Sequence, residues 1–277
     1  MSERFRVWGT LRKMSALFRR DLAVARSYRA AFLLELLETL FGVAGFYFLS
    51  RFIESPQLER ALPQGTSYFS FALVGLAFFD YLSVALRAFD EGLQNARQNG
   101  TLEHLLVTQT SLPVILAGSI LYPFVLLSLR TAIYLGWGAV LFGFPLGEAN
   151  WPGALLVLAA SILAFSGLGV LSASYLLVFK RGSPMNWALV GISSVVGGMM
   201  YPVSVLPAWL QHIARVVPIT YALEGMRAAL LGHAAVRDLW PSLAALLIFA
   251  AILLPVSFAT FSWALRRTKI TGTLTHF

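Results

Sequence analysis

The chain has 277 residues, of which 58% are hydrophobic and 12% are charged, and its formal net charge is +8. Soluble domains average about 25% charged residues, and one of this length could not hide so much apolar surface. The composition therefore excludes an ordinary soluble protein and predicts an all-α integral membrane protein. Loops facing an anionic inner leaflet explain the positive charge better than nucleic-acid binding does. The absence of cysteine excludes disulfides and thiolate metal sites.

Residues 11–28 precede the first apolar stretch and mix basic with apolar side chains. Leu11, Met14, Leu17 and Phe18 recur at helical spacing, with Arg and Lys between them. This pattern predicts an amphipathic helix that lies on the inner leaflet. The alternative is a flank that only orients the first span.

Six apolar stretches are long enough to cross a hydrocarbon core about 30 Å thick, which needs about 20 residues per helix. We expect six transmembrane helices at residues 30–52, 66–87, 113–140, 153–179, 184–206 and 240–265. The segment 104–147 has the length for two spans, but the distribution of positive charge favours one. Two spans there would move the later basic segments to the outer face.

The basic residues are divided unequally between the two sides of these spans. Fifteen of the 21 Lys and Arg residues lie before the first span, after the second, after the fourth or in the C-terminal tail. Positively charged loops stay cytoplasmic, so both termini are predicted to be cytoplasmic. No cleaved signal peptide is expected, because about 30 mixed, charged residues precede the first apolar run.

Four charged residues fall inside the predicted spans, namely Glu35, Glu38, Asp80 and Arg130. Charge within a bilayer is costly and usually faces protein or water. Counting along the helices places Glu38 and Asp80 roughly 10–12 Å from the cytoplasmic side. Arg130 is expected nearer the outer face, where it is not an obvious partner for either. Proton relay is one interpretation, and the favoured one is packing between spans or, for Glu35, a position near the lipid headgroups.

Small residues gather in the fourth and fifth spans, where they predict close approach between helices rather than chemistry. They are Gly167, Gly169, Ser172, Ser174, Gly191, Ser193, Ser194, Gly197 and Gly198.

Residues 88–108 form a mixed-charge segment on the cytoplasmic side, after the second span. Apolar residues and Gly100 make one face of a short predicted helix. This leaves four charged side chains available to a partner, namely Asp90, Glu91, Arg97 and Glu103. The alternative is a solvated helix without a partner.

Pro207 and Pro218 divide residues 203–232 into helical pieces too short to cross a bilayer, so the helices at 207–232 are not expected to span it. Such pieces suit re-entrant or interfacial helices, and Tyr221 fits the interfacial level. Glu224 and Arg227 stand three residues apart, a spacing that allows them to pair on one helical face. The alternative is a simple amphipathic outer loop.

Motifs for covalent chemistry or nucleotide binding are absent from the sequence. It contains no GxxxxGK[ST], no GxSxG and no HExxH, so no catalytic or metal-binding residues are predicted. Any energy from ATP must therefore come from another polypeptide.

Three segments together resemble one known family. They read RQNGTLEHLL at 97–106, YPVSVLPAWL at 201–210 and PITYALEGMR at 218–227. The chain resembles the ABC-2 type permeases, the membrane-spanning subunits of ATP-binding-cassette exporters, over about residues 12–266. The stretch 201–227 is the most specific part of the resemblance.

The resemblance implies a homodimer in the plasma (inner) membrane of a prokaryote, surrounded by lipid. Each copy is expected to dock one of two cytosolic ATPase subunits, which hold ATP and Mg. Docking is assigned to Asp90, Glu91, Arg97, Gly100 and Glu103, and the outer gate to Pro207, Pro218, Tyr221, Glu224 and Arg227. Family substrates are drugs, lipids and lipid-linked glycans, and no residue here selects among them. The implied mechanism is alternating access.

Two rival functions remain open. An ion-coupled secondary transporter would use Glu38 and Asp80 as proton carriers and would transport without ATP, but no inverted repeat supports it. An enzyme acting on membrane lipid would need a nucleophile or a metal constellation, which the sequence lacks.

Overall fold

A computed structural model describes residues 29–53, 62, 65–98, 112–147, 149–179 and 184–270. Regular structure in these ranges is entirely helical, as the composition predicts. The helix expected at 11–28 and the second half of the cytoplasmic segment, from residue 99 to 108, lie outside the described residues.

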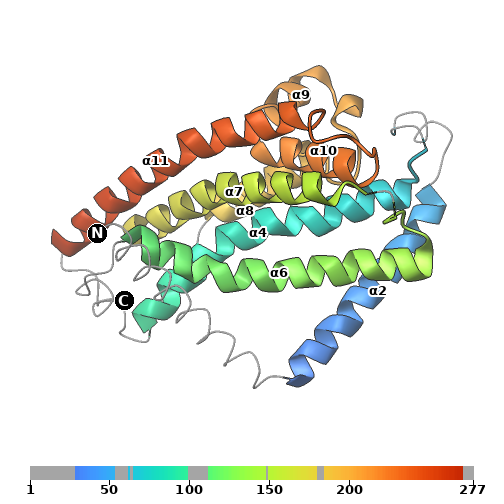
Figure 1. Ribbon diagram of the computed structural model, residues 1–277. Helices are drawn as coiled ribbons and strands as arrows, with labels where there is room; N and C mark the ends of the chain where they lie inside the picture. Colours follow the sequence, from blue (N-terminus) through green and yellow to red (C-terminus); the bar gives the residue numbers. More distant parts are fainter. Residues whose placement is uncertain are drawn as a thin grey trace, which may run out of the picture.

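Five helices within the described ranges are long and apolar enough to cross a membrane. They are α2 (Arg29–Ile53), α4 (Tyr68–Gln98), α6 (Leu112–Phe142), α7 (Trp151–Phe179) and α11 (Trp240–Ile270). In Figure 1, α4, α6, α7 and α11 run alongside one another, whereas α2 slants away from one end of the bundle. Their bounds lie close to the predicted spans, except that α4 continues to Gln98 instead of ending at residue 87. The start of the cytoplasmic segment is therefore continuous with the second span.

Helix α4 lies at the centre of the bundle, where it contacts α2, α6, α7, α8 and α10. Of its apolar stretch 78% is buried, against 22% for α2. Close packing on α7 depends on glycine, because a Cβ on Gly169 would lie 2.3 Å from the carbonyl oxygen of Ala85 in α4. A Cβ on Gly167 would lie 2.7 Å from Leu253 Cβ in α11. The prediction that small residues of α7 serve packing is confirmed.

The fifth expected span, at 184–206, is shorter than the sequence predicts. Helix α8 (Pro184–Val196) has 13 residues, a length of about 20 Å, which is less than the hydrocarbon core requires. Gly198 follows with a φ of 75°, a left-handed conformation that commonly terminates helices. The residues after Gly198 remain largely apolar, so hydropathy alone did not reveal that the helix ends at Val196.

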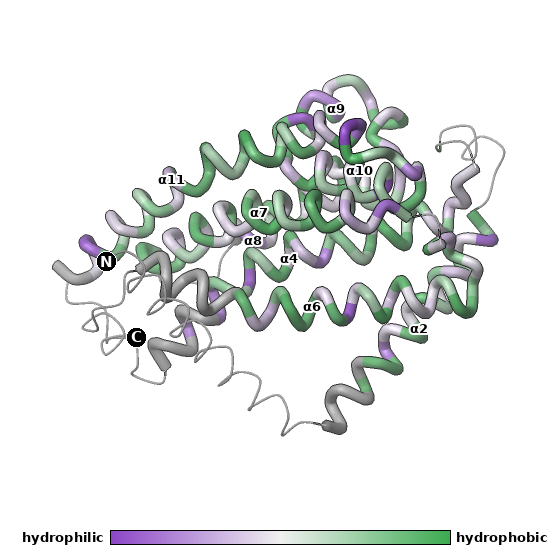
Figure 2. Tube along the Cα trace, viewed as in Figure 1, coloured by the Kyte–Doolittle hydropathy of each residue, from purple (hydrophilic) through white to green (hydrophobic). Residues whose placement is uncertain are grey.

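Three short helices follow α8 and gather at one end of the bundle (Figure 1). They are η1 (Val203–Val205), α9 (Ala208–Ala214) and α10 (Pro218–Leu230). Pro207 directly precedes α9, and Pro218 is the first residue of α10, where its missing N–H costs nothing. The predicted division by these prolines is confirmed. Figure 2 shows hydrophilic residues gathered around α9, in contrast to the hydrophobic length of α7.

Candidate functional site

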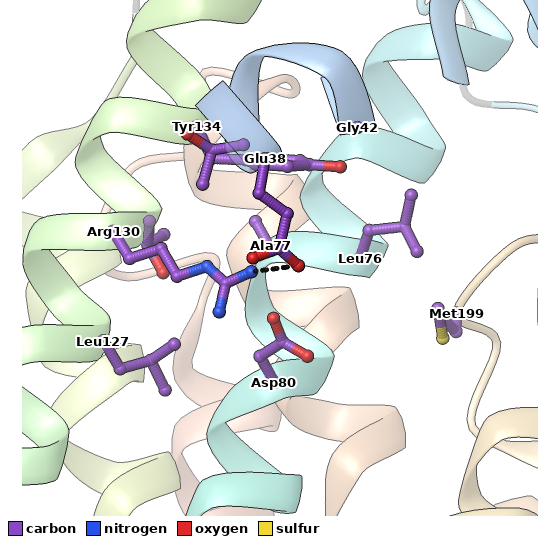
Figure 3. Close-up of a pocket in the computed structure, with 11 residues that line it drawn as sticks. Glu38, Gly42, Leu76, Ala77, Asp80, Leu127, Arg130, Tyr134 and Met199 are labelled. Carbon is purple, nitrogen blue, oxygen red and sulfur yellow. Dashed lines mark ion pairs between the residues drawn. The ribbon is translucent and has the colours of Figure 1, made fainter. Parts of the chain in front are cut away.

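A cavity of about 250 Å³ opens between α2, α4 and α6 and contains three of the four charged residues predicted inside the spans. Figure 3 shows Glu38 entering it from α2, Asp80 from α4 and Arg130 from α6. Its lining residues are Glu38, Thr39, Gly42, Leu76, Ala77, Asp80, Leu127, Arg130, Thr131, Tyr134 and Met199. The fourth predicted charge, Glu35, belongs to α2, and its side chain is outside the described part.

Aromatic packing near the far end of α2 holds this helix against the two others that form the cavity. The ring of Tyr47 stacks on Phe142 of α6, with 4.5 Å between ring centroids. It also meets Phe69 of α4 edge-on at 5.2 Å. This contact holds one end of α2 against α4 and α6, and the helix slants away from the bundle toward its other end (Figure 1).

Arg130 and Glu38 form an ion pair across the cavity, with 3.6 Å between Arg130 Nη2 and Glu38 Oε1. Their side chains are 35% and 72% exposed, so the pair is open on the α2 side. The expectation that Arg130 has no partner among the intramembrane carboxylates was therefore wrong. Counting residues from the expected cytoplasmic ends of the spans did not reveal that Glu38 of α2 lies within reach of Arg130 of α6.

Asp80 is half-buried and points into the same cavity (Figure 3). Within the described part of the chain its carboxylate makes no hydrogen bond and no ion pair. A carboxylate at this depth without a polar partner is costly unless water or a cation reaches it. The cavity thus holds two carboxylates and one guanidinium, with the guanidinium paired to Glu38.

A second cavity of about 220 Å³ adjoins the first and shares Leu127 and Arg130 with it. It lies further toward the C-terminal end of α4, where Arg87 and Glu91 line it. Pro123 inside α6 forms part of its wall. Charged side chains therefore follow one side of α4 from its C-terminal end to Asp80.

Arg227 is buried, with 8% of its surface exposed, and fastens α10 to two other segments. Its Nε donates to the carbonyl of Phe71 in α4 at 3.1 Å. Its Nη1 and Nη2 donate to the carbonyls of Gly198 and Met199, after α8, at 2.7 Å each. The guanidinium also lies 3.5 Å from the centroid of the Phe71 ring. Burial lowers its pKa to about 9, so it remains charged at neutral pH.

The expected ion pair between Glu224 and Arg227 does not form in α10. No ion pair joins these two described residues, and Glu224 is exposed whereas Arg227 is bound to backbone carbonyls. Both residues line a larger cavity of about 580 Å³, between α10, the segment after α8 and the start of α4. Tyr221 lies outside this cavity and donates its hydroxyl to the carbonyl of Arg215 at 3.0 Å.

Asp90 is buried at 6% exposure and lies in a polar cluster between α4, α7 and α8. Ser172 of α7 donates to it at 3.1 Å, and Asn186 Nδ2 of α8 donates to it at 2.6 Å. Asn186 also contacts the carbonyl of Leu86 at 3.3 Å. The expectation that Asp90 offers its side chain to a partner is therefore corrected. Sequence reasoning missed this cluster, because Ser172 and Asn186 are far away in the chain and carry no motif.

The structure describes the other predicted coupling residues only in part. Glu91 is exposed at the end of the second cavity. Arg97 belongs to the last turn of α4, but its side chain is not among those described. Gly100 and Glu103 lie outside the described residues.

Replacing Asp90 by alanine is expected to destabilise the isolated protein by about 1–3 kcal/mol, since the buried hydroxyl of Ser172 and the part-buried amide of Asn186 lose this charged acceptor. Heating followed by size-exclusion chromatography measures this loss. The adjacent, exposed Glu91→Ala is the matched control and should stay within about 0.5 kcal/mol of the wild type. Equal shifts in both variants would contradict the assignment.

Comparison with known proteins places the chain in a family. The family model described as ABC-2 type transporter matches residues 12–231. The linearmycin resistance permease protein LnrN of Bacillus subtilis is 31% identical over 160 residues, 57% of this chain and 40% of that protein. The inner membrane transport permease YadH of Escherichia coli K12 is 25% identical over 171 residues, 61% of this chain and 65% of that protein. The chain thus spans less than two thirds of these two relatives.

A longer alignment is found with nodulation protein J of Neorhizobium galegae, which is 26% identical over 210 residues, 70% of this chain and 74% of that protein. The family match includes α2, α4 and α6 around the charged cavity, and α10 with Arg227. It also includes both segments that were predicted to couple and to gate. Because the family model covers most of its length, the chain belongs to the ABC-2 type transporter family.

Proposed function

We propose that this chain is the membrane-spanning subunit of an ATP-driven exporter. It moves an amphipathic substrate, such as a drug, a lipid or a lipid-linked glycan, across the plasma membrane of a prokaryote, with both termini in the cytoplasm. The observation that carries the proposal is the family match over residues 12–231. The names of relatives, a resistance permease, a transport permease and a nodulation protein, support transport and not one substrate.

The working unit is a homodimer with two cytosolic ATPase subunits, which hold ATP and Mg, while this chain needs no cofactor. Exposed apolar side chains on α2 and α8 support pairing or lipid contact, among them Phe41 at 70% and Trp187 at 82% exposure. ATP-driven closure of the two ATPase subunits pushes on the segment that follows α4. Because α4 is one helix of 31 residues, about 46 Å long, a push at its C-terminal end reaches its opposite end.

The polar ties of α4 suggest which parts move together in alternating access. Near one end, Asp90 is bonded to Asn186 at the start of α8. Near the other, Arg227 joins the carbonyl of Phe71 to those of Gly198 and Met199 after α8. Helices α4, α8 and α10 are therefore proposed to rock as one body against α2 and α6. The cavity that Glu224 lines, beside α10, then opens and closes as the outer gate.

Reconstitution with a candidate cytosolic ABC ATPase subunit from the same genome tests the proposal. Proteoliposomes with both proteins are expected to move a fluorescent phospholipid or an organic dye only when ATP is supplied. A partner whose P-loop lysine is replaced by alanine provides the control. ATP-independent transport that follows an imposed proton gradient, with the same rate in the control, would reject an ATP-driven exporter.

Glu103→Arg is expected to uncouple the two proteins, because charge reversal adds repulsion as well as removing an attraction. The permease should fold, while its ATPase partner either dissociates or hydrolyses ATP without transport. Co-purification and ATPase activity measured on one reconstituted sample check this result. Unchanged binding and transport, both in this variant and in Gly100→Pro, would remove the docking assignment from this segment.

An ion-coupled secondary transporter is the second candidate, favoured by one observation. Glu38 and Asp80 line the same cavity, as proton carriers would. The reconstitution above distinguishes the two, since a proton-driven carrier works without ATP.

A further inference from the structure

We infer that the cavity between α2, α4 and α6 binds an organic cation, with Asp80 as the carboxylate that receives its ammonium group. The inference deepens the proposed transport function and rests on it, because it assigns a cationic group to the exported amphipath. It begins with the charges that line the cavity, which are the carboxylates of Glu38 and Asp80 and the guanidinium of Arg130.

The cavity is negatively charged as a whole when all three groups are ionised. Arg130 is held by Glu38 at 3.6 Å, whereas Asp80 has no ion pair or hydrogen bond within the described residues. Figure 3 shows the Asp80 carboxylate directed into the open space below this ion pair. A cation that enters the cavity therefore meets an available carboxylate, while an anion meets a guanidinium that is already paired.

The remaining walls suit an alkylated ammonium better than a bare metal ion. Leu76, Leu127 and Met199 supply apolar contact, and Tyr134 supplies an aromatic ring to the lining. Aromatic rings and apolar walls are the usual surroundings of quaternary ammonium groups in proteins. A volume of about 250 Å³ accommodates such a head group, and the exposed side at Glu38 leaves an opening for an attached chain.

A second cavity adjoins the site along α4. This cavity of about 220 Å³ extends from Glu91 and Arg87 to Leu127 and Arg130, the two residues that it shares with the site. The eleven-residue step from Glu91 to Asp80 corresponds to about 16 Å along a helix. The distribution of positive charge predicts that Glu91 lies at the cytoplasmic side, so this second cavity, lined by Arg87, Glu91 and Arg130, lies between the site and the cytoplasm.

Direct binding to the purified permease in lipid nanodiscs, without an ATPase, tests the site. Radiolabelled tetraethylammonium is the probe, and 3,3-diethylpentane, its uncharged isostere, is the competitor control. We expect saturable binding that the isostere does not displace. Asp80→Asn should weaken it at least tenfold, because the substitution removes the charge and keeps the shape. Asp238→Asn, in an exposed turn outside the cavity, should bind as the wild type does.

Two further variants test whether binding follows the charge of the cavity, because one should weaken it and the other should strengthen it. Glu38→Gln should also weaken binding, because it removes a negative charge and releases Arg130 toward Asp80. Glu38 is 72% exposed, so this variant tests the site without disturbing the core. Arg130→Gln should strengthen binding, since it leaves two carboxylates and no guanidinium. If these residues were only structural, then Asp80→Asn, Glu38→Gln and Arg130→Gln should all lose cation binding.

The inference is overturned if the wild type shows no saturable binding, or if Asp80→Asn and Glu38→Gln both bind normally. It is also overturned if ethanesulfonate binds instead and Arg130→Gln abolishes that binding, which would identify an anion site. Failure of ATP-dependent transport in the reconstituted complex, with cation binding intact, would reject the exporter and leave the site standing. The two hypotheses therefore fail separately.

Discussion

Replacing Arg227 by alanine is expected to destabilise the permease by about 3–5 kcal/mol and to abolish export through loss of folded protein. Three hydrogen bonds from one charged group disappear together, and each is worth roughly 1.5–3 kcal/mol, although such losses are not additive. The carbonyls of Phe71, Gly198 and Met199 then lose their charged hydrogen-bond donor. Heating followed by size-exclusion chromatography, which needs no thiol dye in this cysteine-free chain, measures the shift.

The matched control is Glu224→Ala, one turn away on the same helix but exposed. It is expected to change stability by less than about 0.5 kcal/mol. Arg227→Lys should fall between the two, because lysine keeps the charge but lacks the planar fork that reaches several carbonyls at once. Equal stability of Arg227→Ala and Glu224→Ala would show that the buried guanidinium does not hold α10 in place.

Gly75→Ala is expected to be almost as damaging, although it adds one methyl group. An added Cβ would lie 1.9 Å from the carbonyl oxygen of Met199 and 2.5 Å from Arg227 Nη2. The backbone after α8 must move away, and the hydrogen bonds of Arg227 are strained with it. Overpacking of this kind costs about 1–3 kcal/mol, and we expect the upper part of that range because backbone atoms are involved.

Gly136→Ala in α6 provides the control for this substitution. It also replaces a glycine inside a long helix, but no described atom beyond its own turn of helix lies within 4 Å of the added Cβ. Alanine there should be neutral or stabilising by up to about 1 kcal/mol, since glycine is the poorer helix former. If both variants unfold at the same temperature as the wild type, the contact between α4 and the Met199 segment is not rigid.

The sequence was sufficient to predict the long helices. The length of an apolar stretch predicts both that a helix forms and how long it is. Helices α7 and α11 begin within two residues of the predicted starts at 153 and 240. The proline-bounded pieces α9 and α10 were also predictable, because proline has one preferred place at a helix start. These features depend on local sequence, where a single chain carries the information.

The partners of the charged residues could not be predicted in the same way. Arg227 binds backbone carbonyls, which carry no sequence signature, and Asp90 is buried by Ser172 and Asn186 from other helices. The pairing of Glu38 with Arg130 joins side chains of α2 and α6, and hydropathy does not encode which helices lie side by side. The end of α8 was missed because the residues after Val196 remain apolar while the backbone turns at Gly198.

Helix α8 is attached to α4 at both of its ends, directly through Asp90 and, at the other end, through Arg227. The number of residues between these two attachments is therefore fixed by the structure. Asn186 and the carbonyls of Gly198 and Met199 must reach Asp90 and Arg227 at the same time. One inserted residue would turn everything beyond it by about 100° and advance it by about 1.5 Å, so only one attachment would survive. Length variation in this protein should therefore be tolerated in connecting segments and excluded between Asn186 and Gly198.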